Sequence, residues 1–352
     1  PPGTQTIFGS DPPAADVDLA SVVHGAQSNG TPGALVEIAD HNWVVAVGIE
    51  DPGGMATSYP VLRLLASDGN TMSPKFYVPI LNPDGRECRF PRVDCTYMGD
   101  DYVDVIIVYR YATSTYNWDD IEDYWDIRVH RMIFRWYEGE WINDVATVPI
   151  QQPVASENPS RGQTHPDIVF DQESGDIYCA WTDMTRNGSD LLYARYYYDE
   201  ITYEWHWSDA YSLESEQREH DPWYVSLDVG LVEWQDDALD EGRYVGFAYT
   251  GNFPESETDV LWGFRPVVGC WDITSGADDD DHPAQIVLVN WDDFEPEEDG
   301  PKYSAGLARV DIGPDDADPH GAAVVFVQDT EYPSFGSYEA YGISSLDFSD
   351  FS

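Results

Sequence analysis

Short apolar runs joined by turn-rich loops recur along the whole chain, and this recurrence constrains the fold more than any other feature. Residues 165–183 read HPDIVFDQESGDIYCAWTD, two runs with period-two alternation joined by DQESGD. Such a pattern predicts a β-hairpin. Counterparts of its second run occur at 43–51, 104–112, 244–252 and 323–330. Helical periodicity is scarce, so the sequence predicts an all-β protein.

Each of these hairpins is followed by a third apolar run, and most by a fourth. The third runs are VLRLLASDG (61–69), IRVHRMIFRWYEG (127–139), LLYARYYYDE (191–200), VLWGFRPVVG (260–269) and EAYGISSLD (339–347). The fourth runs are KFYVPI (75–80), DVATVPI (144–150), SDAYSL (208–213) and AQIVLVN (284–290). Five units of four antiparallel strands are typical of a five-bladed β-propeller.

The units begin beside Pro32, Pro91, Pro166, Pro222 and Ser304, at spacings of 59, 75, 56 and 82 residues. We therefore expect a single domain over 1–352, with blades at about 31–80, 90–150, 165–213, 221–290 and 303–347.

The fifth unit contains only three runs, and VDLASVV (17–23) has the pattern of the missing strand. We expect this N-terminal strand to complete the last blade and close the ring, which removes open sheet edges. A β-sandwich, or two β domains, is the alternative, but it does not explain three runs at one end and a single run at the other.

The charge balance limits the partners of the chain. It has 17 basic and 66 acidic residues, a formal net charge of −49. This charge excludes nucleic acid and anionic membrane surfaces, which are bound mainly through Lys and Arg. Self-repulsion of this size favours a salty or calcium-rich medium, so we expect a secreted or surface-displayed, halophilic protein. The longest apolar runs, near 322–327, are too short to cross a bilayer.

Cysteines and acidic clusters give two further predictions. Cys88 and Cys95, in CRFPRVDC, are close enough in sequence for a disulfide, while Cys179 and Cys270 are buried thiols or a second bridge. Asp278, Asp279, Asp280 and Asp281 form an oxygen-rich run that could bind calcium. A solvated acidic loop is the alternative, since no EF-hand spacing is present.

The pattern HPDIVFD-x-x-SGDIYCAW resembles the repeats of secreted sialidase-like (BNR-type) propellers. The five-bladed architecture is also similar to that of tachylectin-like lectins and of arabinanase and fructosidase glycoside hydrolases. The resemblance implies a glycan-related function. However, the Asp-box pattern S-x-D-x-G-x-T-W of sialidases is not reproduced, so sialidase activity is not expected.

In a propeller the first strand of each blade lines the channel, so residues at these strand starts are candidate ligand contacts. They are Arg92, Arg161, His165, Asp167, His220, Asp221, Trp223 and Tyr303. Guanidinium, carboxylate and imidazole groups beside an aromatic ring suit a sugar. The alternative is that proline-flanked strand starts are purely geometric and the channel holds water.

These considerations favour a binding or structural module for a glycan or a protein partner, within a larger surface assembly. A glycoside hydrolase remains the alternative, with Asp94, Asp167 and Asp221 as its carboxylates. By resemblance, five-bladed glycosidases place the first of their catalytic carboxylates near the start of the first blade. Here TPGALVEIAD (31–40) carries no carboxylate at that point. Serine hydrolase, zincin and nucleotide-binding motifs are absent.

Overall fold

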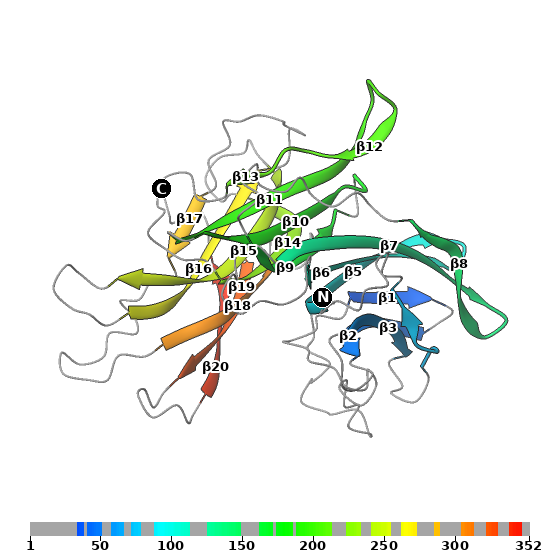
Figure 1. The fold of residues 1–352 in the computed structure, drawn as a ribbon, viewed down its shortest axis with the longest axis horizontal. Helices are drawn as coiled ribbons and strands as arrows, with labels where there is room; N and C mark the ends of the chain where they lie inside the picture. The colour runs from blue at the N-terminus through cyan, green and yellow to red at the C-terminus, as the bar shows by residue number, and fades with distance from the viewer. Residues whose placement is uncertain are drawn as a thin grey trace. The chain divides into compact units, whose positions relative to one another are not determined.

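The computed structural model describes sixteen segments of the chain, and all of their regular structure is β-strand (Figure 1). The segments are 34–38, 41–50, 58–66, 72–78, 88–112, 125–148, 162–171, 174–185, 188–212, 223–233, 241–254, 262–272, 285–288, 304–312, 322–329 and 338–346. No helix in these segments is long and apolar enough to cross a membrane. The prediction of an all-β chain is confirmed.

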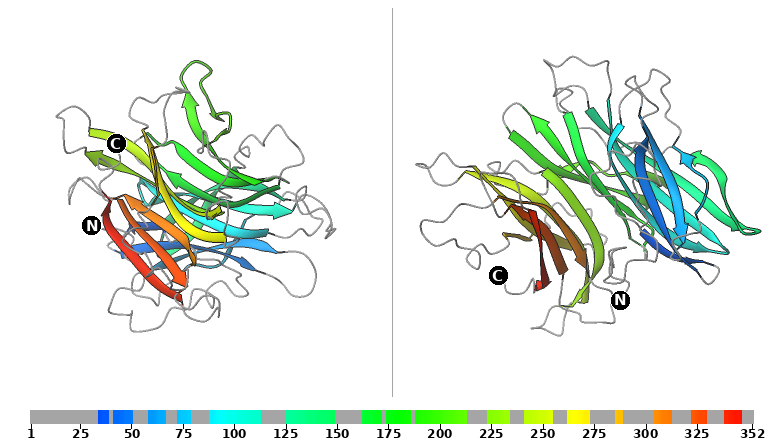
Figure 2. Two further views of the ribbon diagram at one scale, coloured as in Figure 1. Left: turned by 90° about the vertical axis from the view of Figure 1, so that its left-hand side faces the viewer. Right: turned by 90° about the horizontal axis from the view of Figure 1, so that it is seen from below.

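The first two sheets have four strands each, in sequence order and antiparallel (Figure 2). The first contains β1 (Ala34–Ile38), β2 (His41–Glu50), β3 (Tyr59–Ala66) and β4 (Phe76–Tyr77). The second contains β5 (Cys88–Gly99), β6 (Tyr102–Ala112), β7 (Trp125–Tyr137) and β8 (Glu140–Val148).

Two-residue turns determine the register of the second sheet. Asp100 and Asp101 join β5 to β6 with φ of 52° and 66°, and Glu138 and Gly139 join β7 to β8 with φ of 51° and 88°. Two consecutive positive φ angles are typical of type I′ turns, whose twist matches that of the flanking strands. Local sequence therefore closes both hairpins.

The third sheet contains the hairpin predicted at 165–183. Its strands are β9 (Gly162–Phe170), β10 (Ile177–Thr185), β11 (Gly188–Asp199), β12 (Glu204–Trp207) and β13 (Tyr211–Ser212). The turn between β9 and β10 is held by Asp171, which donates its N–H to the Asp176 carbonyl (2.9 Å) and accepts the Ser174 hydroxyl (2.6 Å). Two short strands pair with β11. One is β13, which lies within the predicted run 208–213. The other is β12, which was not predicted and forms because a short turn after Asp199 returns the chain early.

The remaining strands form two sheets. One contains β14 (Trp223–Glu233), β15 (Glu241–Pro254), β16 (Trp262–Asp272) and β17 (Gln285–Leu288). The other contains β18 (Ser304–Ile312), β19 (Ala322–Asp329) and β20 (Tyr338–Leu346). Residues 17–23 lie outside the described segments, so the closure of the last sheet stays a prediction.

The chain divides into two compact units, which we describe separately. One contains residues 2–184 and 193–211; the other contains residue 1, 185–192 and 212–352. The single domain over 1–352, the five blades and the ring therefore stay predictions.

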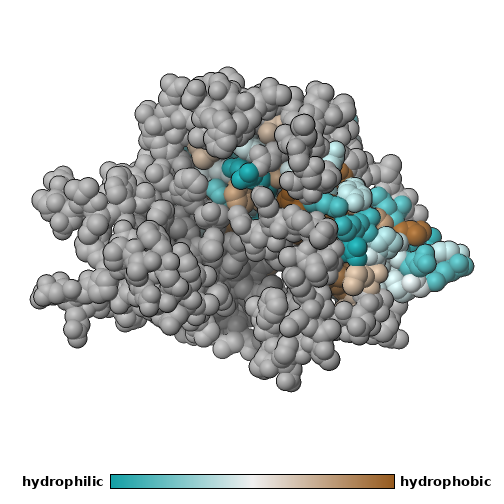
Figure 3. Space-filling model, turned by 60° about the horizontal axis from the view of Figure 1, so that its bottom comes forward, coloured by the Kyte–Doolittle hydropathy of each residue, from teal (hydrophilic) through white to brown (hydrophobic). Residues whose placement is uncertain are grey.

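The core of the unit that contains β1–β10 lies between the first two sheets. Trp43 of β2 packs against Trp136 and Trp141, with ring centroids 5.0 and 5.3 Å apart. Fully buried Leu64 and Val105 belong to the same cluster. On the face shown in Figure 3 the coloured residues are mainly hydrophilic or intermediate, with separate hydrophobic ones between them. Burial of the apolar side chains provides most of the stabilisation.

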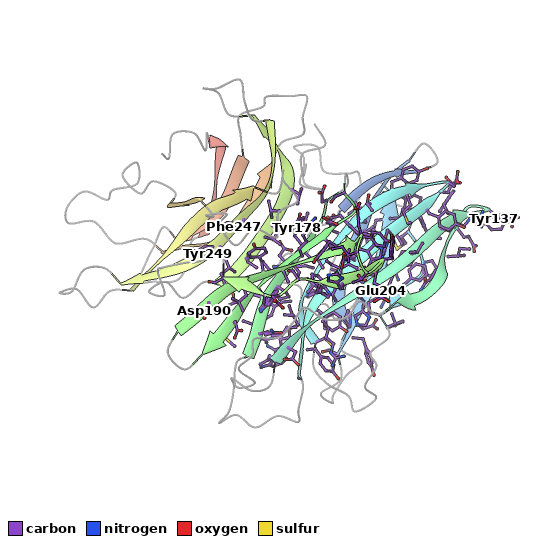
Figure 4. The ribbon with its side chains drawn as sticks, turned by 90° about the horizontal axis from the view of Figure 1, so that it is seen from above. Tyr137, Tyr178, Asp190, Glu204, Phe247 and Tyr249 are labelled. Atoms are coloured by element: carbon purple, nitrogen blue, oxygen red, sulfur yellow. The ribbon has the colours of Figure 1, made fainter. Side chains whose placement is uncertain are left out.

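A smaller core is visible in the other unit. Phe247 and Tyr249 are two residues apart on β15 and therefore share a face, with centroids 6.3 Å apart and rings nearly parallel (Figure 4). Both are buried, as are Val225 and Leu227 of the neighbouring strand β14.

The predicted disulfide between Cys88 and Cys95 is wrong. Both are buried thiols on the single strand β5, seven residues apart. A strand of that length spans roughly 23 Å at about 3.3 Å per residue, far beyond the reach of a disulfide. The prediction rested on closeness in sequence, but the two cysteines lie on one continuous strand. Cys179, on β10, is also a buried thiol, and Cys270 lies on β16 with its side chain undescribed.

Candidate functional site

The first strands of four sheets each contain one extra residue at a corresponding place. Between two successive paired positions the first strand advances by three residues and the second strand by two. This difference defines a β-bulge. The partners on either side are Arg89–Arg110 and Arg92–Val108, Thr164–Thr182 and Asp167–Ala180, Trp223–Thr250 and Ser226–Ala248, and Gly306–Val327 and Arg309–Val325. A bulge redirects the side chains that follow it, and bulges are frequent beside functional sites.

The bulges of β5 and β9 share an unusual backbone and touch each other. Phe90 and His165 have φ of 52° and 48°, and each precedes a proline. Positive φ is uncommon for residues other than glycine, while proline suits a bulge because it donates no ladder hydrogen bond. The rings of Phe90 and His165 lie 4.3 Å apart. The two strand starts therefore form one local structure.

The residues directly after these two bulges form an ion pair. Arg92 Nε lies 3.9 Å from Asp167 Oδ1, with side-chain exposures of only 3% and 9%. His165 is also buried. The structure thus brings together three residues that the sequence singled out, but it places them beneath the surface. The ion pair links β5 to β9.

Arg110 connects this pair of bulges to the neighbouring strands. Its guanidinium lies 4.6 Å from the centre of the Phe90 ring and 3.9 Å from that of Trp125. Its Nη1 donates a hydrogen bond to Thr164 Oγ1 at 2.9 Å. Arg110, Phe90 and Trp125 were missed by the sequence analysis, although a lone Arg in the apolar run DVIIVYRYA is a signal that could have identified the first. Arg110 and Phe90 are half-buried, so both are partly accessible to solvent.

The imidazole of His165 is neutral in this environment. Burial, followed by the nearby Arg110 and Arg92 charges, lowers its pKa from 6.5 to about 3. A neutral imidazole carries one hydrogen-bond donor and one acceptor. His165 therefore does not act as a proton donor of imidazolium type near neutral pH.

Asp94 joins β5 to the end of β9. Its Oδ1 accepts the N–H of Cys95 at 2.8 Å, and its Oδ2 accepts the N–H of Phe170 at 2.7 Å. Burial raises the pKa of Asp94 from 3.8 to about 6; the two N–H groups oppose this shift and the Asp167 charge adds to it. Asp94 is thus a carboxyl group that takes up a proton in mildly acidic solution.

We call Phe90, Arg92, Asp94, Arg110, Trp125, Thr164, His165 and Asp167 the bulge cluster. Two guanidinium groups oppose two carboxylates, and aromatic rings lie beside them. This balance is local, because the chain as a whole carries −49. Such a combination of polar groups and apolar ring surface can bind a neutral polar molecule.

Several predicted residues lie elsewhere. Arg161, His220, Asp221 and Tyr303 fall outside the described segments, as do Asp278, Asp279, Asp280 and Asp281. Trp223 begins β14 in the other unit, and its side chain is not described. Among the residues that the structure describes, no group of three or more His, Cys, Asp or Glu could hold a metal ion. Calcium binding stays a prediction.

Among known protein families, no family model matches the chain. No curated protein matches it either.

Among solved structures, an alpha-L-arabinanase of Penicillium chrysogenum complexed with arabinobiose is 9% identical, with TM-score 0.47, and the match covers 88% of this chain and 79% of that one. An alpha-L-arabinofuranosidase from Fusarium graminearum is 10% identical, with TM-score 0.47, covering 88% and 80%. An ulvan lyase with a bound GlcA–Rha3S unit is 10% identical, with TM-score 0.45, covering 91% and 68%. At these values the chain is similar to each only in the course of its backbone.

Proposed function

We propose that the chain is a five-bladed β-propeller, secreted or surface-displayed in a salty medium, that binds a neutral glycan through the bulge cluster. One observation carries this proposal: the recurring bulge puts a redirected side chain at the same place in four first strands. In the part of the chain that the structure describes, five sheets, the last with three strands, support the blade count. Strand 17–23 would complete the fifth blade.

The local charge balance of the bulge cluster, with two guanidinium groups and two carboxylates, favours a neutral sugar over an ion. Arg110 presents a guanidinium that contacts the Phe90 and Trp125 rings and donates to Thr164, so its position is already determined before a ligand arrives. Preorganisation of this kind lowers the entropic cost of binding. The buried Arg92–Asp167 ion pair and the neutral His165 lie in the same cluster as Arg110. A larger surface assembly around this module remains part of the proposal.

A glycan array in high salt, with and without a chelator, tests this function. The variant Arg110→Met removes the accessible guanidinium. Arg135→Met is the matched control, because Arg135 is also half-buried and lies 5.1 and 5.2 Å from the Tyr102 and Tyr137 rings, outside the bulge cluster. We expect the wild type and Arg135→Met to bind the same glycans and Arg110→Met to lose them. Silence of the wild type across the array would contradict the proposal and favour a protein partner.

A second function, glycoside hydrolysis, has one observation in its favour. Asp94, with a pKa raised to about 6, lies close enough to Asp167 to be affected by its charge. A raised pKa is what a general acid requires. Against it, both Asp94 oxygens accept backbone N–H groups and Asp167 faces Arg92. Release of reducing sugar from a polysaccharide panel at pH 5–7, abolished in Asp94→Asn but not in Arg135→Met, would establish hydrolysis; no release would exclude it for that panel.

A further inference from the structure

A second surface, outside the bulge cluster, carries exposed aromatic side chains on the hairpin of β11 and β12. Strand pairing places Tyr196 opposite Trp207 and Tyr198 opposite Trp205, so these four rings share one face of the hairpin. Tyr197 and His206 form the opposite face, with centroids 4.6 Å apart. We call Tyr196, Tyr198, Tyr203, Trp205 and Trp207 the aromatic hairpin. In Figure 1 this hairpin continues past its neighbouring strand β10.

The rings form a continuous series that becomes more exposed toward the turn. Tyr196 lies 5.6 Å from Trp205 with nearly parallel planes and 5.2 Å from Trp207, while Tyr198 lies 5.7 Å from Trp205. Trp207 is buried, whereas Trp205 and Tyr198 are 39% and 43% exposed. Tyr203 in the turn is 75% exposed, and the adjacent Ile201 is 89% exposed. Large apolar side chains gathered in this way on a surface indicate a binding site.

The hairpin is held rigidly at both ends. At the turn, Asp199 accepts hydrogen bonds from the Ile201 N–H (2.7 Å) and the Thr202 hydroxyl (2.9 Å). At the base, Arg195 binds Asp176 through Nε at 2.8 Å and Nη2 at 2.6 Å. Ser208 donates its N–H to the Arg195 carbonyl at 2.8 Å. The backbone that carries the exposed rings is therefore already ordered when a ligand arrives, which favours binding.

The charges around the rings restrict what can bind. Strand alternation places Asp199 and Glu204 on the face of the hairpin opposite the rings, where Tyr197 and His206 lie; Glu204 is labelled in Figure 4. Exposed Glu200 directly follows Asp199 in the turn, and the chain carries −49 overall. These charges repel anionic glycans and oppose contact with a second copy of the chain. They leave a neutral ligand, which can contact the ring faces without charge repulsion.

The size of the patch argues against a stable protein interface. Tyr198, Ile201, Tyr203 and Trp205 together expose on the order of 500 Å², if each large side chain offers about 200 Å² in full. A stable protein interface buries about 800 Å² on each partner. The flat C–H faces of a few sugar rings fit the smaller area.

We propose that the aromatic hairpin binds a neutral oligosaccharide by stacking of sugar rings on Trp205 and Tyr198. This site is carried by β11 and β12, so it is separate from the bulge cluster on β5, β6, β7 and β9. It would bind a polysaccharide independently of any ligand at the bulge cluster.

Calorimetric titration of the full chain in high salt tests this proposal. The probes are neutral hexasaccharides of glucose, mannose, xylose and arabinose, with a sulfated hexasaccharide as the anionic comparison. We expect at least one neutral probe to bind, the sulfated probe not to bind, and Trp205→Ala and Tyr198→Ala to weaken binding by about tenfold each.

Two variants separate this site from others. Tyr137→Ala removes a ring that is 48% exposed at the end of β7, apart from Glu204 in Figure 4, and we expect it to leave the affinity unchanged. Arg110→Met removes the bulge-cluster contact and should not affect the hairpin. The proposal is overturned if no neutral probe binds, if only the sulfated probe binds, or if both hairpin variants, folded by circular dichroism, retain wild-type affinity. If Arg110→Met alone abolishes binding, the bulge cluster binds the sugar and the hairpin does not.

Discussion

Replacement of Asp94 by Asn tests the account of the bulge cluster most directly. The folded protein holds a proton on Asp94 up to about pH 6, because burial raises its pKa from 3.8. In the unfolded chain the same group ionises near its ordinary value. Between these two values the folded state binds more protons than the unfolded state, so the free energy of unfolding must fall as the pH rises.

The size of this effect follows from the shift. A shift of roughly two units, at about 1.36 kcal/mol per unit, gives a loss of about 3 kcal/mol between pH 3.5 and pH 7. The amide group introduced by Asp94→Asn does not titrate, and its oxygen can still accept one of the two backbone N–H groups. The difference in free energy of unfolding between wild type and Asp94→Asn should therefore fall by about 3 kcal/mol across this range.

Urea unfolding at constant high salt, followed by tryptophan fluorescence at six pH values, measures this difference. Comparing the two proteins cancels the background of the other acidic residues, which both share. Asp199→Asn is the control with the opposite sign: the N–H of Ile201 and the hydroxyl of Thr202 lower the pKa of Asp199, so its contribution should increase with pH. A difference for Asp94 that is flat, or that rises with pH, would refute the reasoning and show that the two N–H bonds outweigh burial.

Three further predictions concern the unit that contains β1–β10. Alkylation in denaturant without reductant should modify Cys88 and Cys95, because strand geometry separates them. Mass spectrometry that finds both cysteines unalkylated in one peptide, two hydrogens lighter than its reduced form, would contradict this. Arg131→Met should cost about 3 kcal/mol of unfolding free energy, because it leaves buried Asp104 without the guanidinium that binds it; the double variant with Asp104→Leu should recover part of the loss, and no recovery would refute the pairing. Trp181→Ala should lower stability by about 4 kcal/mol, since Trp181 is fully buried; a loss below about 1 kcal/mol in urea unfolding would show that the site is loosely packed.

Much of the candidate site could be anticipated from the position of prolines at strand starts. Arg92, His165 and Asp167 were singled out on this basis, and the structure places them together. Their burial was not predictable, because period-two patterns do not show whether a polar residue faces water or a neighbouring sheet. Arg110 was missed for a related reason: it lies on a second strand, and only the packing of β6 against β9 brings it to Thr164.

The exposed rings of β11 and β12 illustrate the same limit. The alternation in the run LLYARYYYDE does not show which of its tyrosines are buried. Tyr196 does pack partly, but Tyr198 is exposed, because the register with β12 and the early turn after Asp199 place it near the hairpin tip. The spacing of residues predicts on which face of a strand a side chain lies, but not how deeply that face is buried.

The sequence by itself determined the strands, their antiparallel order within each sheet and the tight turns between them. These depend on alternation and on turn residues such as Asp100 and Gly139, which act between neighbours in the chain. Only the tertiary structure decided that β5 runs unbroken through Pro91, that Phe90 meets His165, and that Asp94 bonds to Phe170. The last two contacts join residues 75 and 76 positions apart, and they depend on how sheets pack, which no local pattern encodes.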